Sequence, residues 1–183
     1  MELIIFQILV LLFSVVIHEV SHGVVADHLG DPTARLQGRL TLNPLKHLDP
    51  FGSVILPLML VVLNTGVVFG WAKPVPHNPM NLKNPEKGGA LIAVAGPLSN
   101  FTLALVFALI FRIVASFGAS SVLLGLISQI VLINIVLAIF NLVPIPPLDG
   151  SKVLFALMPK TESTLNFFMQ LERYGIFLVF LFV

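Results

Sequence analysis

The sequence contains no cysteine and few charged residues. With no thiol in its 183 residues, disulfides and thiolate metal sites are excluded, so any bound metal ion must use His, Asp or Glu. Charged residues make up 10% of the chain and hydrophobic residues 57%, and the mean hydropathy is +1.00. Soluble proteins are roughly half apolar and a quarter charged, so these proportions predict an integral membrane protein. The net charge of +1 and the lack of a basic cluster predict no nucleic-acid partner.

Several apolar stretches are long enough to cross the hydrocarbon layer of a membrane, which takes about 20 residues. The expected helices run from about Glu2 to Leu29, from Gly88 to about Phe117, from Ser120 to about Leu142, and onward from about Ser163. The first stretch lacks the charged leader and cleavage site of a signal peptide, so we expect it to be retained. Only ten residues follow Arg173, so the last helix either ends within the bilayer or is truncated.

Two further segments do not read as membrane-crossing helices. Residues 34–43 alternate apolar and polar side chains, and this period of two predicts a half-buried strand. Residues 51–70 are apolar but are broken by Pro57 and by Asn64-Thr65-Gly66, which predicts a re-entrant segment. The predicted fold class is therefore an all-α polytopic membrane protein with about four transmembrane helices, a re-entrant segment and a short membrane-associated β-strand or hairpin. Residues 1–183 are expected to form a single integral-membrane domain.

The end of the first apolar helix carries the sequence His18-Glu19-Val20-Ser21-His22. Residues four apart on a helix share a face, so His18 and His22 can bind one cation while Glu19 reaches the edge of the same site. This arrangement supplies two zinc ligands and a general base. A five-residue pattern can also arise by chance on a solvated helix, but ionisable groups at membrane depth are costly and usually functional.

Catalytic zinc sites usually need a third protein ligand, and Asp149 is the best candidate. It follows an apolar helix and the sequence Pro144-Ile145-Pro146-Pro147-Leu148, whereas most other acidic residues lie at helix ends or in loops. Two alternatives stay open: Asp149 could instead cap the helix that begins at Ser151, and Glu172 could be the ligand. Arg173 beside Glu172 favours an ion-paired or interfacial role for that residue.

Three motifs together resemble the site-2 proteases, a family of intramembrane zinc metalloproteases. They are His18-Glu19-Val20-Ser21-His22, Ala95-Gly96-Pro97-Leu98-Ser99-Asn100 and the stretch from Asn141 to Gly150. The resemblance implies a Zn²⁺ cofactor with the ligands His18, His22 and Asp149. It also implies that Glu19 is the catalytic base and that Asn141 is an active-site amide near the substrate. Asn100 matches a family motif as well and is assigned to substrate binding. The small size, without the PDZ domain of larger relatives, resembles the small prokaryotic branch.

A shared metal ion makes a prediction about topology, because its ligands must lie at one depth in the bilayer. Let A be the membrane face where the first helix starts and B the opposite face. If the first helix runs from A to B, the helix before Asp149 must also run from A to B. The helix from Gly88 must then run from B to A. Nearly all Lys and Arg residues fall on face B in this arrangement, and the positive-inside rule makes B the cytosolic side of a prokaryotic cell membrane.

The expected substrate is a transmembrane segment of a membrane protein, with lipid as the other partner. Such a helix must unwind before its peptide bonds can be cut, and the strand predicted at 34–43 could receive the opened segment by strand addition. Leu40 is therefore a predicted substrate-binding residue, and Leu40→Pro should impair cleavage without releasing zinc. Two other functions stay open: a membrane metal-ion transporter, and an inactive homologue that binds membrane segments.

Overall fold

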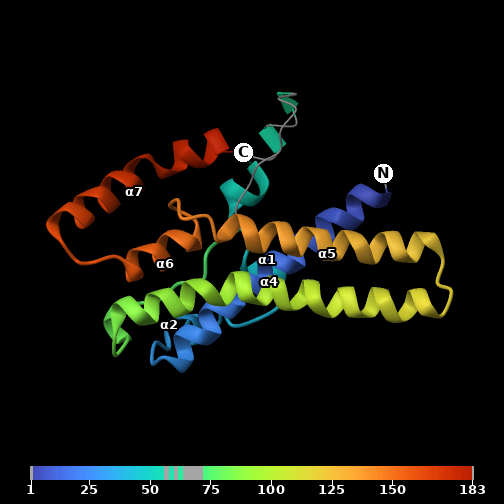
Figure 1. The fold of residues 1–183 in the computed structure, drawn as a ribbon, viewed down its shortest axis with the longest axis horizontal. Coiled ribbons are helices and arrows are strands. Elements are labelled where there is room, and N and C mark those ends of the chain that lie inside the picture. Colours follow the sequence, from blue (N-terminus) through green and yellow to red (C-terminus); the bar gives the residue numbers. More distant parts are fainter. Residues whose placement is uncertain (1, 56–57, 60–61, 64–71, 183) are drawn as a thin grey trace.

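The structure, a computed structural model, describes residues 2–55, 58–59, 62–63 and 72–182, and these are mostly helical. In Figure 1 the helices labelled α1, α4 and α5 lie together, with α6 and α7 toward one end of them. The long helices are α1 (Glu2–His28), α4 (Pro85–Ser116) and α5 (Ser121–Asn141). The remaining elements are α2 (Thr33–Leu36), η1 (Pro44–Lys46), the π-helical η2 (Pro50–Ile55), η3 (Pro79–Asn81), α6 (Asp149–Leu157) and α7 (Glu162–Phe182).

Three helices among the described residues are long and apolar enough to cross a membrane, namely α1, α4 and α5. Two of them begin at capping residues that the sequence supplies. The Asn84 side chain accepts a hydrogen bond from Lys87 N at the start of α4, and Ser120 Oγ accepts one from Leu123 N at the start of α5. The expected fourth span, α7, forms a helix, but Glu172 and Arg173 interrupt its apolar run. Of the four expected spans, the described part of the chain confirms these three by length and composition.

Side-chain hydrogen bonds give the relative directions of the three long helices. Gln7 of α1 bonds to Gln129 of α5, and Ser14 of α1 bonds to Asn134 of α5. The partners follow the same order along both helices, so α1 and α5 are parallel. His18 and His22 of α1 bond to Asn100 and to the Ile92 carbonyl of α4 in reverse order, so α1 and α4 are antiparallel. These are the directions expected for helices that bring their ligands to one depth.

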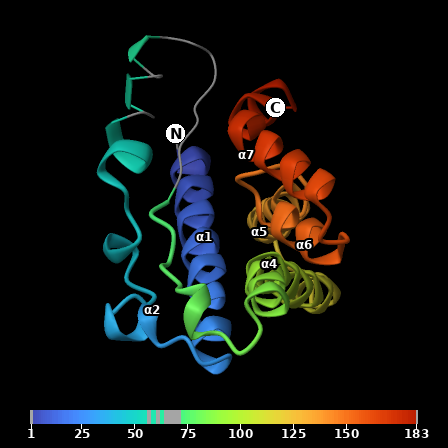
Figure 2. The same cartoon turned by 90° about the vertical axis from the view of Figure 1, so that its left-hand side faces the viewer.

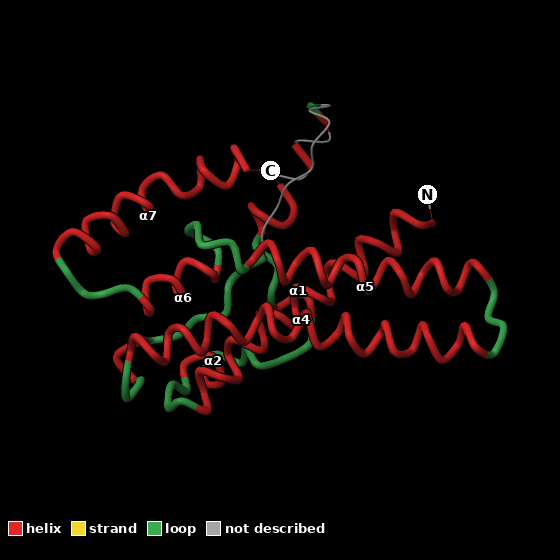
Figure 3. The backbone as a smooth tube through the Cα atoms, in the orientation of Figure 1, coloured by secondary structure: helices red, strands yellow, loops and turns green. Residues whose placement is uncertain are grey.

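Residues 34–43 do not form the predicted strand, and no described residue lies in a strand (Figure 3). Thr33–Leu36 form the short helix α2, and Gly38, with φ of +62°, ends it. The Gly38 and Arg39 amides donate to the carbonyls of Arg35 and Ala34, a Schellman closure that fixes a helical turn. Burial does not alternate either: Leu36 is 75% exposed and Arg39 is 6% exposed. The strand prediction was wrong because local helix-ending bonds outweighed the alternating pattern.

The described part of the chain between α1 and α4 is mostly irregular and lies on one side of α1, and α4 to α7 lie on the other (Figure 2). The stretch before residue 51 contacts the stretch after residue 71, since Lys73 N donates to the His47 carbonyl at 2.8 Å. The predicted re-entrant path of residues 51–70 lies largely outside the described residues. Both flanks of that segment nevertheless meet near the end of α1, beside the candidate site.

Candidate metal and catalytic site

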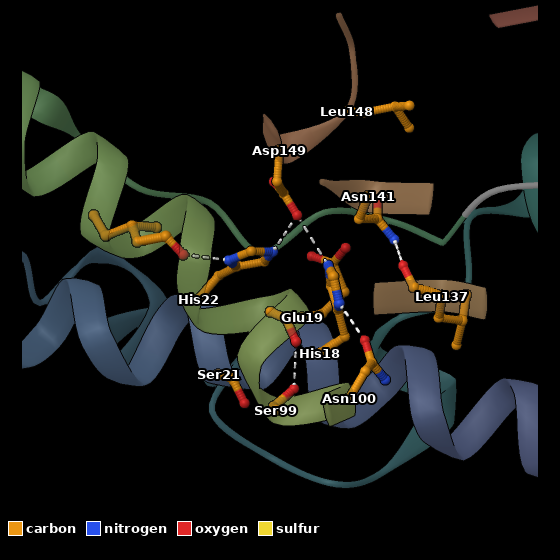
Figure 4. A network of polar contacts seen from close by, with 12 residues as sticks. His18, Glu19, Ser21, His22, Ser99, Asn100, Leu137, Asn141, Leu148 and Asp149 are labelled. Carbon is orange, nitrogen blue, oxygen red and sulfur yellow. Dashed lines mark hydrogen bonds and ion pairs between the residues drawn. The ribbon is translucent and has the colours of Figure 1, made fainter. Parts of the chain in front are cut away.

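Two histidines of α1 and the first residue of α6 converge on one point (Figure 4). Asp149 Oδ2 lies 3.0 Å from His18 Nε2 and 3.1 Å from His22 Nε2. One ligand atom from each of the three residues lies within 4.8 Å of the others. His18 is 6% exposed and Asp149 is 7% exposed. The structure thus brings together the three side chains that the sequence predicted would meet, from positions 131 residues apart.

The outer nitrogens of both imidazoles are held by oxygen acceptors. His18 Nδ1 lies 2.6 Å from Asn100 Oδ1, and His22 Nδ1 lies 2.6 Å from the Ile92 carbonyl oxygen. These oxygens can only accept, so each Nδ1 donates its N–H, and Nε2 is the atom of each ring that faces Asp149. An unprotonated Nε2 on both rings would place two lone pairs beside a carboxylate oxygen, and this donor set suits a divalent cation. The donor set and its outer hydrogen bonds are those of zinc sites.

Gly96 allows α4 to approach the two rings closely. A Cβ at this position would lie 2.5 Å from His22 Nε2 and closer still to His18 Nε2. Real Cβ atoms do not come this near to other atoms, so any side chain would displace the metal-facing nitrogens. Glycine is therefore required here for a packing reason at the site itself.

Glu19 lies beside His18 and lines a cavity of about 690 Å³. Its Oε2 accepts a hydrogen bond from Val75 N at 2.9 Å, and its Oε1 has no hydrogen-bond partner among the described residues. His18, His22, Asn141 and Asp149 line the same cavity. The predicted base thus lies next to the candidate ligands, with one carboxylate oxygen held and the other open to the cavity.

The segment that holds Glu19 is itself anchored by a buried arginine. Arg39 Nη2 donates to the carbonyls of Lys73 at 2.9 Å and of Pro74 at 3.3 Å. These bonds fix the extended chain just before Val75. Arg39 was not among the predicted site residues, because its sequence position in an alternating pattern suggested a solvent-facing strand residue.

Asn141 and Asn100 have different surroundings. Asn141, at the end of α5, lines the cavity and donates to the Leu137 carbonyl at 2.9 Å. Asn100 is 0% exposed and does not line this cavity. Its oxygen faces His18, so its geometry favours holding a ligand over the predicted contact with substrate.

Leu40 packs against α1 outside the cavity. Its Cδ2 would lie 2.6 Å from a Cβ built on Gly23. The strand on which its predicted role depended is absent, so strand addition at Leu40 has lost its basis.

The structure decides between the alternatives left open for the third ligand. Asp149 does not cap α6: the N-cap position is Leu148, and no side chain caps the helix there. Glu172 lies away from the His18 and His22 rings and lines a neighbouring cavity of about 1030 Å³. Asp149 is the acidic residue that meets both imidazoles.

The two cavities adjoin each other along the irregular segment and α6. Ala72, Pro74, His77, Pro147 and Lys152 line both of them. Burial and the nearby Lys152 ammonium lower the pKa of His77, so its ring is neutral at ordinary pH.

Two buried polar residues near the site were missed from the sequence, namely Ser14 and Asn134. A signal for each was present. Ser14 lies four residues before His18, on the same helical face, and Asn134 lies seven before Asn141. Isolated polar side chains in otherwise apolar spans usually have a partner or a function.

Helices that can cross a membrane, together with a buried His-Glu-x-x-His pair met by a distant Asp, define the class of membrane-embedded metallopeptidases. The family model of Peptidase family M50, the site-2 protease family, matches residues 6–129 and 112–182. The chain therefore belongs to Peptidase family M50.

Relatives with similar sequences come from bacteria and an archaeon. "Putative zinc metalloprotease YwhC" of Bacillus subtilis is 40% identical over 185 residues, which cover 96% of this chain and 78% of that protein. Rip2 of Mycolicibacterium smegmatis, with the same description, is 32% identical over 84% of this chain and 58% of its own length. MJ0611 of Methanocaldococcus jannaschii, also so described, is 47% identical over 38% of this chain and 35% of its own. The comparison with solved structures found no match.

Proposed function

We propose that this chain is an intramembrane zinc protease that binds its metal through His18, His22 and Asp149. Membership in Peptidase family M50 makes zinc the cofactor and peptide hydrolysis the reaction. The observation that carries the assignment of residues is the meeting of the Nε2 atoms of His18 and His22 with Asp149 Oδ2 beside Glu19. The proposed substrates are transmembrane segments of membrane proteins, because the site lies among helices of membrane length.

Each residue of the site has a distinct task in the proposed hydrolysis. When bound, zinc supplies Lewis-acid chemistry that polarises an acyl carbonyl and makes water more acidic. Glu19 takes a proton from the attacking water and passes it to the leaving amine as the C–N bond breaks. The Val75 N–H keeps the Glu19 carboxylate in place, since it holds Oε2 and leaves Oε1 to handle the proton. Asn141 supplies a carboxamide that can hydrogen-bond the substrate carbonyl as it gains negative charge.

The cavities provide what hydrolysis within a membrane requires. Water must reach the peptide bond, and irregular backbone at membrane depth is tolerated where it lines a wet cavity. The segment 72–77 supplies such backbone along both cavities. We place an unwound substrate segment along this surface, with its scissile carbonyl beside Glu19.

The test compares Glu19→Gln with the wild type in detergent. We expect bound zinc to stay at the wild-type level, because Glu19 is not one of the three convergent side chains. Cleavage of a panel of single-span membrane proteins should fall at least about 100-fold, the scale of a lost general base. Zinc content is measured by elemental analysis and cleavage by gel.

Glu162→Gln is the matched control, because Glu162 is an exposed carboxylate at the start of α7. It should leave both zinc content and cleavage unchanged. If Glu19→Gln binds zinc and cleaves as fast as the wild type, Glu19 is not the base. A wild type that binds zinc and cleaves no membrane segment would favour a binding function instead.

A further inference from the structure

A buried polar network extends from His18 across α1, α4 and α5. Its members beyond the ring are Ser14 of α1, Asn100 of α4 and Asn134 of α5. Ser14 is 4% exposed, and both asparagines are 0% exposed. Asn100 Nδ2 lies 2.9 Å from Asn134 Oδ1 and 3.3 Å from the Ser14 carbonyl. Asn134 Nδ2 lies 2.9 Å from Ser14 Oγ and 2.9 Å from the Ile130 carbonyl.

The donors and acceptors of this network fix the orientation of both amides. Asn134 uses its NH₂ group on the Ile130 carbonyl and Ser14 Oγ, so its oxygen must face Asn100. Asn100 then uses its own NH₂ group on that oxygen and on the Ser14 carbonyl, so its oxygen must face His18. Rotating the Asn100 amide by half a turn would place its NH₂ against the His18 N–H and its oxygen against two other oxygens. In a buried site such mismatches are costly.

We propose that Asn134 and Ser14 are positioning residues for the metal site, acting through Asn100 on the tautomer and orientation of His18. By keeping the Asn100 oxygen toward Nδ1, they keep the proton on Nδ1 and the lone pair of Nε2 toward Asp149. This rests on the proposed function only in that His18 binds zinc. Outer hydrogen bonds of this kind typically contribute about 10–100-fold to metal affinity.

A second interhelical hydrogen bond provides the control. Gln7 Nε2 donates to Gln129 Oε1 at 2.9 Å and joins the same two helices, α1 and α5, at a part-buried position nearer the other end of α1. No hydrogen bond among the described residues leads from this pair to His18. If the Asn134 contacts only hold α1 to α5, removing either bond should have the same consequences.

The experiment compares Asn134→Leu with Gln129→Leu in detergent. Both variants should lower the melting temperature of the chelator-treated protein, because each loses a bond between α1 and α5. In competition with a zinc chelator, Asn134→Leu should bind zinc about tenfold more weakly, whereas Gln129→Leu should match the wild type. Equal zinc affinity in all three proteins would overturn the proposal and leave Asn134 as a packing residue.

A direct readout of His18 follows from the same logic. In the zinc-loaded protein, the His18 Nδ1–H proton should exchange slowly with solvent by nuclear magnetic resonance. It should exchange faster in Ser14→Ala, which removes one acceptor from Asn134. In Gln129→Leu the exchange rate should equal that of the wild type. This milder variant tests the proposal even if Asn134→Leu does not fold, and an unchanged exchange rate in Ser14→Ala would contradict it. A wild type that binds zinc but cleaves nothing would reject the proposed function and leave this inference standing.

Discussion

At the scale of single residues, the candidate metal site depends on the lack of a side chain at Gly96. Gly96 has no reactive group, yet the Nε2 atoms of His18 and His22 lie within 2.5 Å of where its Cβ would be. The close approach of α4 also lets the Ile92 carbonyl and Asn100, one turn to either side, reach the outer nitrogens of the two rings. One short stretch of α4 thus holds the outer nitrogens of both imidazoles and leaves room for their inner nitrogens.

Gly96→Ala should therefore abolish tight zinc binding. The added methyl group would push the rings away from Asp149, and we expect zinc affinity to fall at least about tenfold, with cleavage falling in parallel. Gly89→Ala is the matched control on the same helix, because a Cβ there meets nothing within 4 Å. It should retain zinc affinity. Chelator competition measures both, and a Gly96→Ala protein with wild-type affinity would show that α4 can withdraw without cost to the site.

The sequence could predict which ligands meet but not what surrounds them. The i, i+4 spacing of His18 and His22 and the isolated acid at Asp149 carry their own geometric meaning, and in the structure the three side chains meet. That they bind zinc stays a prediction. The partners of the outer nitrogens, Asn100 and the Ile92 carbonyl, depend on the depth and rotation of α4 against α1. No local pattern encodes that rotation.

At the scale of elements, the irregular segments are joined by one buried carboxylate. Asp31 is 0% exposed and lies three residues after the end of α1. It accepts hydrogen bonds from Thr33 N and Oγ at the start of α2, and from Asn78 N and Asn81 Nδ2 at 2.6 and 2.7 Å. A residue that looked like an ordinary helix-end acid in the sequence thus fixes where the segment 72–78 returns to α1. The failed strand prediction has the same origin, because these short-range caps and closures outweigh periodicity.

Asp31 should make stability depend on pH. Burial alone would raise its pKa, but hydrogen bonds from Thr33, Asn81 and Asn78 hold it below the ordinary value of 3.8. A lowered pKa in the folded state means that the stabilisation is fully present above the ordinary value. It is lost as the pH falls through the lower, folded-state pKa. Thermal unfolding in detergent at pH 7 and over the acid range should show this loss in the wild type.

Asp31→Asn should remove most of that acid dependence and destabilise the protein at pH 7 by about 2–3 kcal/mol, because an NH₂ group would face N–H donors. Asp27→Asn is the control four residues earlier. Its carboxylate pairs with Arg35 at 3.0 Å on the surface, where such pairs contribute about 0–1 kcal/mol. Equal destabilisation by the two variants would mean that the Asp31 network contributes little.

At the scale of the whole molecule, the helix directions sort the charges. The end of α1, the start of α4 and the end of α5 lie at one end of the bundle, since α4 runs opposite to the other two. The segments at that end carry most of the basic residues: Arg35, Arg39, Lys46, Lys73, Lys83, Lys87, Lys152 and Lys160. Arg112, near the end of α4, lies toward the opposite end. The positive-inside rule then favours a cytosolic position for the end that holds the candidate site.

The absence of cysteine makes this orientation directly measurable. Leu36 in α2 is 75% exposed at the basic end, and Phe117 between α4 and α5 is 86% exposed at the other. In intact bacterial cells that express single-cysteine variants, a membrane-impermeant maleimide should label Phe117→Cys. Leu36→Cys should be labelled only after the membrane is permeabilised, and the cysteine-free parent at neither stage. Labelling of Leu36→Cys in intact cells, with Phe117→Cys protected, would place the candidate site on the outer side. Such a site would then lie on the side of the membrane opposite to the one that the basic residues at that end favour.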